Sequence, residues 1–241
     1  MVLGKTEEES SGIITRKMAE ILLYHKLLEF PLFLGMKHKD IMELVAHTRF
    51  GFMKEDANKT IVEADSPCDS IIMLVNGQIE SITASADKNF MVEEVFNSPF
   101  TLQPENIFGM TQRYTSTFRT STKSHFITIS KQELCILIDK FDTIKFNYLN
   151  MLAALVQKKQ RATWLPNGTD TRSHIITFLT SHCIRPSGHK VYHILMNRLA
   201  EEVNTSRLEV SRELNKMQEE GLVTLARGRI TIPFLERFVT L

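Results

Sequence analysis

MNRLAEEVNTSRLEVSRELNKMQEEGLV, residues 196–223, is the stretch that decides the fold of the C-terminal part of the chain. Leu199 and Val203 lie on one apolar side of a short helix, because helical residues four apart share a face. Asn204-Thr205-Ser206 breaks this pattern and supplies N-cap chemistry for a second helix. Gly221 stands where that helix must end in a residue that tolerates positive φ. The stretch therefore predicts two helices joined by a tight turn.

The second helix separates apolar from polar side chains. Four apolar residues are predicted to face inward: Leu208, Val210, Leu214 and Met217. Three polar residues are predicted to face away from them: Arg207, Ser211 and Arg212. A helix, a tight turn and a helix form the motif that lays its second helix into the major groove of DNA. The outward side chains would then meet bases and phosphates.

A basic hairpin is predicted directly after the helix pair. Residues 222–226 and 230–232 have the composition of short strands, and Arg227-Gly228-Arg229 forms the turn between them. Helix pair and hairpin together indicate a winged helix-turn-helix. Positive charge at the wing would bind phosphates, which adds affinity without reading the DNA sequence.

Charge is distributed unevenly along the 241 residues. The chain is 43% hydrophobic and 24% charged, which is typical of a soluble globular protein of about two domains. Its formal net charge is +1, but the part from Gln157 onward holds 13 Lys and Arg against 8 Asp and Glu. We therefore expect only the C-terminal part to meet a polyanion.

Several function classes are not supported by the sequence. Cys68, Cys135 and Cys183 are widely separated and form no CxxC pair, which predicts reduced, mostly buried thiols, no disulfide framework and no metal site. There is no secretory signal core and no run of 18 apolar residues, so a cytoplasmic protein without a membrane partner is expected. The common hydrolase, metalloprotease and nucleotide-binding motifs are missing, and no enzyme and no catalytic residue are predicted.

The N-terminal two-thirds combine helices with many short strands. Helices are predicted at 13–28, 39–48 and 131–141, and strands at 60–62, 70–75, 78–83, 91–95 and 125–129. Asn76-Gly77, between two of these strands, is typical of a tight hairpin. The predicted fold class is α+β, with an antiparallel sandwich or small barrel in this part.

A long helix at 143–163 carries an apolar seam. Phe146, Leu149, Ala153 and Val156 are spaced by three and four residues, as in a coiled coil. The core stripe of a monomer has the same spacing, so the pattern admits both interpretations. We favour a dimer helix, because two recognition helices related by a twofold axis can bind half-sites about one DNA turn apart.

The predicted organisation has three parts. Residues 1–142 form N-terminal helices and an effector-type β-roll, 143–166 the dimerisation helix and hinge, and 167–241 the winged helix-turn-helix DNA-binding domain. Asn167-Gly168-Thr169-Asp170 breaks the helical pattern and marks the hinge. Thr169 or Asp170 is expected to cap a helix over 171–183.

This order of parts resembles the Crp/Fnr family, the catabolite-activator-like bacterial transcription regulators, over about residues 30–232. The motifs that carry the resemblance are Leu199-Ala200, Thr205-Ser206-Arg207, Val210-Ser211-Arg212-Glu213-Leu214, Glu220-Gly221-Leu222-Val223, Pro31-Leu32-Phe33 and Cys68-Asp69-Ser70 with Asn76-Gly77. The resemblance implies a dimeric, sequence-specific transcription regulator. It also implies a cyclic-nucleotide-binding-like β-roll (a double-stranded β-helix). The partners it implies are double-stranded DNA with a pseudo-palindromic site and RNA polymerase.

The resemblance also assigns roles to residues of the helix pair and wing. Arg207 and Arg212 occupy the family's two arginine positions, whereas Leu208 stands where a base-reading Glu is usual. We expect Arg212 to read a base, Arg207 to bind a phosphate or a base, and Ser206 to contact the DNA backbone. The full set of expected DNA-binding residues is Thr205, Ser206, Arg207, Ser211, Arg212, Arg227 and Arg229.

The effector pocket departs from the pattern of the cyclic-nucleotide-binding members. The candidate residues are Phe108, Gly109, Met110, Arg113, Tyr114 and Thr115. Met110 replaces the usual acid, and Tyr114 falls near the usual Arg. Arg113 is one residue away, which in a strand is the opposite face. A buried phosphate needs a charge partner, so no cyclic nucleotide cofactor is expected.

Other sensing modes and another function class stay open. No cysteine precedes Cys68, which argues against an iron–sulfur cluster, whereas several histidines leave haem sensing possible in principle. The β-roll would sense an unidentified effector or none, and an apo dimer controlled by its abundance is a further option. The alternative function is a cyclic-nucleotide-type regulatory module that acts through protein partners, which the basic wing disfavours.

Overall fold

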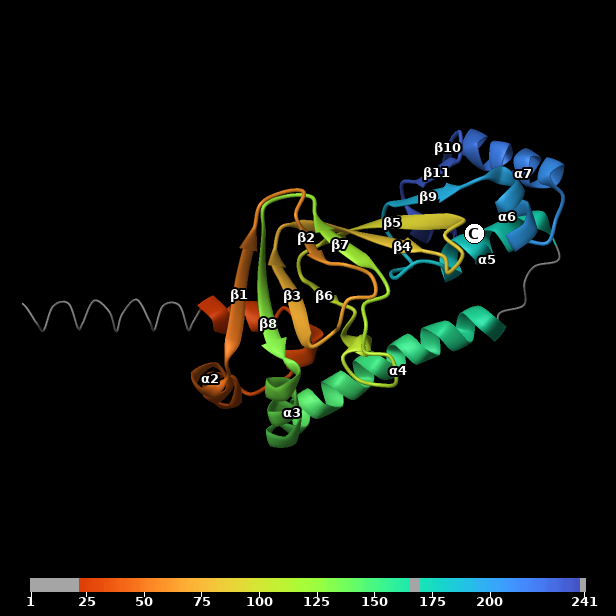
Figure 1. Ribbon diagram of the computed structural model, residues 1–241. Coiled ribbons are helices and arrows are strands. Elements are labelled where there is room, and N and C mark those ends of the chain that lie inside the picture. Colours follow the sequence, from red (N-terminus) through yellow and green to blue (C-terminus); the bar gives the residue numbers. More distant parts are fainter. Residues whose placement is uncertain (1–21, 165–169, 239–241) are drawn as a thin grey trace, which may run out of the picture.

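A computed structural model describes residues 22–164 and 170–238, and it combines a β-roll, a long helix and a small C-terminal domain (Figure 1). The strands are β1 (Phe50–Glu55), β2 (Thr60–Val62), β3 (Ser70–Asn76), β4 (Gln78–Ala84), β5 (Phe90–Asn97), β6 (Phe100–Leu102), β7 (Thr117–Thr120), β8 (Ser124–Ser130), β9 (Lys190–Ile194), β10 (Thr224–Ala226) and β11 (Arg229–Ile232). The α-helices are α2 (His38–His47), α3 (Lys131–Lys140), α4 (Asp142–Trp164), α5 (Thr171–Ser181), α6 (Met196–Glu202) and α7 (Arg207–Glu219). Short 3-10 helices are η1 (Pro31–Phe33), η2 (Pro104–Asn106) and η3 (Leu235–Phe238).

Two antiparallel sheets organise these strands. One has the order β1-β8-β3-β6, and the other has the order β10-β11-β9-β5-β4-β7-β2. Strands β1 to β8 of both sheets form the β-roll, and β9 to β11 belong to the C-terminal domain, so the second sheet runs from one into the other. The predicted α+β class with an antiparallel β-roll is confirmed.

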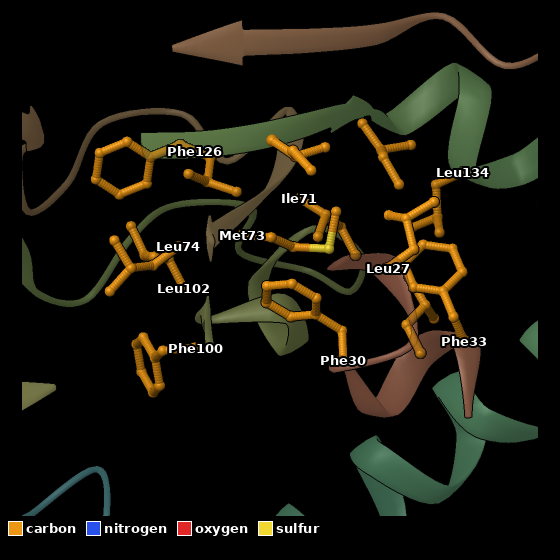
Figure 2. Close-up of a cluster of buried hydrophobic side chains, with 14 of the residues drawn as sticks. Leu27, Phe30, Phe33, Ile71, Met73, Leu74, Phe100, Leu102, Phe126 and Leu134 are labelled. Carbon is orange, nitrogen blue, oxygen red and sulfur yellow. The ribbon is translucent and has the colours of Figure 1, made fainter. Parts of the chain in front are cut away.

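The core of the β-roll is filled by large apolar side chains from alternate strand positions and from the N-terminal helical segment. Phe30, directly before η1, and Phe33, its last residue, are both buried in this core, and the Phe30 ring lies next to Met73 of β3 in Figure 2. Ile71, Leu74 and Leu102, from the same sheet, close the space around them. Removing this much apolar surface from water is the main favourable term in folding such a domain.

The Asn76-Gly77 hairpin prediction is wrong. Strand β3 pairs with β6 and β8, whereas β4 pairs with β5 and β7, so the chain crosses from one sheet to the other at Gly77. Gly77 has φ +105°, and a Cβ there would collide with Ser124 Oγ and lie 2.8 Å from the Lys123 carbonyl oxygen. Only glycine fits this corner, because of its backbone angle and because the β7–β8 connection passes so close. The hairpin of this region is β4–β5, closed where Ser85 N–H donates to the Phe90 carbonyl over 3.0 Å.

Most predicted elements agree with the structure within two residues. All five predicted strands of the N-terminal part exist, as do the helices predicted at 39–48, 131–141, 143–163 and 171–183. Of the helix predicted at 13–28, residues 22–27 are helical, and residues 13–21 lie outside the described residues. Four strands were not predicted: β1, β6, β7 and β9. Asp170 caps α5 by accepting from Ser173 N–H over 2.9 Å, and residues 167–169 of the predicted hinge lie outside the described residues.

Candidate nucleic-acid interface

Local sequence chemistry fixes both ends of α7, the second helix of the pair. Ser206 Oγ accepts from Glu209 N–H over 3.2 Å, and the Glu209 carboxylate reaches back to the Ser206 N–H, which completes a capping box. Asn204 takes a left-handed backbone (φ +49°) in the turn before it, and Gly221 takes φ +71° directly after the helix. The predicted cap chemistry and helix end are confirmed.

The inner side of α7 packs on the core of the C-terminal domain. Val210, Leu214 and Met217 are completely buried, as predicted, and they stand four and three residues apart. The prediction for Leu208 is wrong, because its side chain is 69% exposed. Leu208 precedes Val210 by two positions, which on a helix of 3.6 residues per turn is about 200° away from it. Leu208 therefore lies on the outer side of α7.

The outer side of α7, which we call the reading face, consists of Arg207, Leu208, Ser211 and Arg212. Both arginines are exposed, Ser211 is half-buried, and the preceding Thr205 is half-buried as well. Within the described residues neither arginine forms an ion pair. An exposed helix face that holds two cations without an internal partner is suited to an external anion.

The wing lies beside the reading face. Strands β10 and β11 pair with Ala226 opposite Arg229, so Arg227 and Gly228 form the turn and Arg229 begins the second strand. Arg227 and Arg229 are exposed. A groove of about 350 Å³ separates the wing from the start of α7, and Arg207, Arg227 and Arg229 all line it. Three of the predicted DNA-binding residues are therefore brought together around one groove.

A surface ion-pair network holds α7 against α5. Arg172 Nη2 lies 2.6 Å from Glu220 Oε2, and Arg172 Nη1 lies 3.5 Å from Glu213 Oε1. The hydrogen bond from Arg172 and its charge hold the pKa of the Glu220 carboxyl below its ordinary value. Arg172, Glu213 and Glu220 have no predicted role from the sequence; they link α5 to α7 and its C-cap and do not line the groove beside the wing.

The candidate effector residues do not gather in one cavity. Tyr114 is buried in the β-roll core, where its hydroxyl donates to the Ser70 carbonyl over 3.2 Å and burial raises its pKa. Gly109, Met110 and Thr115 are exposed. Arg113 is exposed too, and its guanidinium donates to the Asp65 carbonyl.

Polar groups inside this part of the β-roll come instead from Gln103. Its side chain accepts from Thr115 N–H over 2.9 Å and donates to Ser116 Oγ over 3.0 Å. Phe108 is half-buried, with Tyr148 edge-on at 5.8 Å between ring centroids and the Lys131 ammonium 5.0 Å from its ring centre. Arg113, the cation among the six candidate effector residues, is exposed. Among the described residues no cluster of three or more His, Cys, Asp or Glu could hold a metal ion.

The seam of α4 lies on the outside of the chain. Phe146 is 61% exposed, and Leu149, Ala153 and Val156 are exposed with it. On the opposite side of the helix, Ile144 is buried in the β-roll core. The seam is thus not a core stripe of the described chain, and of the two interpretations of the pattern the monomer core is wrong.

Cys68 and Cys183 are buried, as expected for most of the thiols, and Cys135 is exposed.

Comparison with known proteins identifies the C-terminal domain. Residues 173–240 match the family model of the Crp-like helix-turn-helix domain. No curated protein matches the sequence. Within the described residues, no helix has the length and apolar character needed to cross a membrane.

Solved structures with a similar arrangement were also found. The catabolite activator protein of Thermus thermophilus is 15% identical, with a TM-score of 0.44, and the match covers 87% of this chain and 97% of that one. The global regulator CLP of Xanthomonas campestris is 17% identical, with a TM-score of 0.44 and coverage of 82% and 99%. FixK2 of Bradyrhizobium japonicum is 12% identical, with a TM-score of 0.44 and coverage of 80% and 97%.

Proposed function

We propose that the chain, which carries a Crp-like helix-turn-helix domain, is a DNA-binding transcription regulator of the Crp/Fnr type and that two copies of it bind a pseudo-palindromic site in double-stranded DNA. The observation that carries the proposal is the set of exposed arginines on α7 and the wing that form no ion pair with any of the described residues. Two of them, Arg227 and Arg229, flank the groove beside α7 and are suited to phosphates. The half-site is read by the outer side of α7.

The reading face combines one apolar and two cationic side chains. Arg212 lies one turn into α7 and can donate two hydrogen bonds to guanine O6 and N7. Leu208 is exposed beside it and offers an apolar contact, which suits the methyl group of thymine. A half-site with a guanine next to a thymine therefore fits this helix. Arg207, at the edge of the groove, takes a phosphate or a base.

The exposed seam of α4 supports the dimer. Phe146, Leu149, Ala153 and Val156 form an apolar stripe on a helix that is otherwise anchored to the β-roll by its other side. Covering such a stripe with a second copy removes it from water and places two recognition helices about a twofold axis. RNA polymerase is the protein partner that a bound regulator of this type would meet.

The signal that reaches the β-roll is a different class of ligand from a cyclic nucleotide, or the dimer needs none. A buried phosphate requires a cation inside the pocket, and Arg113 lies at the surface. The candidate effector residues that do point inward are aromatic.

Selection of bound sequences from a random DNA library, followed by gel shifts over a range of salt concentrations, tests the function. We expect a symmetric site and a log affinity that falls linearly with log salt. Arg227→Ala should reduce the salt slope by about 1, as one phosphate contact is lost. Arg119→Ala, an exposed arginine of β7, is the matched control and should leave the slope unchanged. Binding without sequence preference or salt slope would support the regulatory module that acts through protein partners.

Sedimentation of variants tests the dimer separately. Phe146→Glu places a charge in the exposed seam and should give a monomer with weakened DNA binding, because the two half-sites are then bound independently. Phe52→Glu, on β1 and 67% exposed, is matched in residue type and exposure and should remain a dimer. If both variants sediment like the unmodified protein, α4 is not the dimer helix.

A further inference from the structure

Strand β5 belongs to both halves of the molecule. In the β-roll it pairs with β4, and on its other edge it pairs with β9 of the C-terminal domain over five consecutive residues (Figure 1). The register places Phe90 opposite Ile194, Val92 opposite Tyr192 and Glu94 opposite Lys190. The winged helix is therefore joined to the β4–β5 hairpin by a ladder of backbone hydrogen bonds, in addition to the covalent connection after α4.

One side of β5 also contributes to both hydrophobic cores. Phe90 and Val92 are buried in the core of the C-terminal domain, where the Phe90 ring lies 5.3 Å from that of Phe178. Phe96, on the same side, is buried in the β-roll core and stacks on Phe100 at 4.1 Å. Glu94 lies between these two apolar groups and is completely buried.

Glu94 is fully partnered by the segment that leads from α5 into β9. Its carboxylate lies 2.9 Å from Lys190 Nζ, and both side chains are 0% exposed. It also accepts hydrogen bonds from the backbone N–H groups of Ile184, at 2.5 Å, and Arg185, at 3.2 Å. A buried carboxylate with three such partners fixes the position of this segment, because moving it would leave a charge without compensation.

The long helix holds the same segment from the other side. Lys158 of α4 donates to the carbonyl groups of Cys183, at 3.2 Å, and Ile184, at 2.6 Å. The segment thus gives its amides to β5 and its carbonyls to α4. Farther along the hairpin, Asp87 lies 2.9 Å from Arg198 of α6, which ties the hairpin tip to the helix pair.

We infer that Glu94 is a positioning residue for DNA binding: through it, the β4–β5 hairpin holds the winged helix in the orientation that binds the operator. The inference rests on the proposed function. In the paired state, in which β5 is hydrogen-bonded to β9, the reading face and the wing are open to solvent. Their arginines are all exposed: Arg207, Arg212, Arg227 and Arg229. Anything that shifts β5 in the β-roll would thereby move the recognition helix.

A reversible crosslink in the full chain tests whether the paired state is the one that binds. Met91 and His193 face each other in the β5–β9 register, so Met91→Cys with His193→Cys, in a Cys135→Ser background, can be oxidised across the two strands. We expect oxidised and reduced protein to bind the selected DNA with affinities that agree within about twofold. If oxidation lowers the affinity by about fivefold or more and reduction restores it, pairing inhibits DNA binding and the inference is wrong.

Glu94→Gln tests the role of the residue itself. It keeps the shape of the side chain and leaves Lys190 without its counter-charge, and we expect the DNA affinity to fall by about tenfold or more at an unchanged salt slope, because no phosphate contact is lost. In the crosslinked background the same substitution should lose little affinity, since the covalent bond then holds the strands together. Because a disulfide also stabilises a fold, urea unfolding of Glu94→Gln is measured in parallel, and a variant that is still folded under the binding conditions shows that its lost affinity is not a general folding defect. Glu80→Gln, a half-buried carboxylate of β4 that lies outside the β5–β9 junction, is the matched control.

The outcomes separate the inference from the function on which it rests. If the unmodified protein binds no DNA, the proposed function fails and the inference fails with it. If it binds and Glu94→Gln binds equally well, the inference alone is overturned.

Discussion

The molecule holds two groups of cations that differ in how their charge is compensated. At the junction with the β-roll, Lys190 and Lys158 are enclosed by a carboxylate and by backbone carbonyls. On α7 and the wing, the exposed arginines have no ion-pair partner among the described residues. Where the chain compensates a charge internally, the charge holds structure in place, and where it does not, the charge is available to a polyanion. The two groups should therefore respond in opposite ways to substitution.

The largest effect is expected for Lys190→Ala, measured as the free energy of unfolding in urea. The substitution leaves Glu94 buried without a counter-charge, which should cost about 3–5 kcal/mol. Lys216→Ala, whose partner Glu213 lies 3.2 Å away at the surface, is the control and should cost about 1 kcal/mol or less. The difference between the two regions would disappear if both lysines cost the same.

Glu94→Met combined with Lys190→Met provides a second comparison at the junction. Replacing both partners removes the unpaired charge, so this double variant should be more stable than Lys190→Ala. A double variant that is as unstable as the single one would mean that packing, and not charge, dominates at this position.

The next effect is expected for Arg212→Ala, and it should appear in DNA binding and not in stability. Loss of a base contact should weaken binding to the selected site by about 1–3 kcal/mol and relax the preference at one base pair. Unfolding in urea should be unchanged within about 0.5 kcal/mol, because the side chain is exposed. An equal loss of affinity on all sequences would make Arg212 a phosphate contact.

The sequence predicts the helix pair that carries the reading face because the determinants of both helices are local. The capping box of Ser206 and Glu209, the left-handed Gly221 and the spacing of Val210, Leu214 and Met217 all lie within one short stretch. The wing follows for the same reason. The prediction for Leu208 is wrong because it rests on the apolar character of the side chain alone, whereas the position of Leu208 around the helix places it outward. An exposed leucine between two arginines is itself a sign of a recognition surface.

The junction could not be predicted in the same way, because its determinants are far apart in sequence. Strand β9 pairs with β5 across about a hundred residues, and no local pattern specifies such a partner. The hairpin prediction at Asn76-Gly77 is wrong for a similar reason, because the close approach of Ser124, which is distant in sequence, determines the backbone path there. One clue to Glu94 was present. In a strand, alternate residues share a side, and Glu94 alternates with Val92 and Phe96, both apolar.

Ser206 contributes both to the stability of α7 and to the start of the reading face. Ser206→Ala should therefore have a measurable effect, smaller than that of Arg212→Ala. Its hydroxyl accepts from Glu209 N–H, so its removal should destabilise the fold by about 1 kcal/mol in urea unfolding. Ser206→Asp keeps an acceptor at the N-cap and should retain stability. The same variant adds negative charge at the start of the reading face and should weaken DNA binding. If Ser206→Asp binds DNA as well as the unmodified protein, Ser206 does not lie near a phosphate.

The smallest effect concerns Glu220, whose pKa is held below its ordinary value of 4.5 chiefly by the hydrogen bond from Arg172. A carboxyl group whose pKa is lower in the folded state contributes stability above its unfolded pKa and loses it as the pH falls through the folded pKa. Stability should therefore decrease less on acidification in Glu220→Gln than in the unmodified protein, when urea unfolding is compared at neutral pH and below the ordinary pKa. Glu219→Gln, its exposed neighbour, is the control. Identical pH profiles for all three proteins would show that this surface pair contributes nothing measurable to the free energy of unfolding, unlike the buried pair of Glu94 and Lys190. The physical reason would be that the Glu220 carboxylate is exposed, so that water and salt screen its interaction with Arg172.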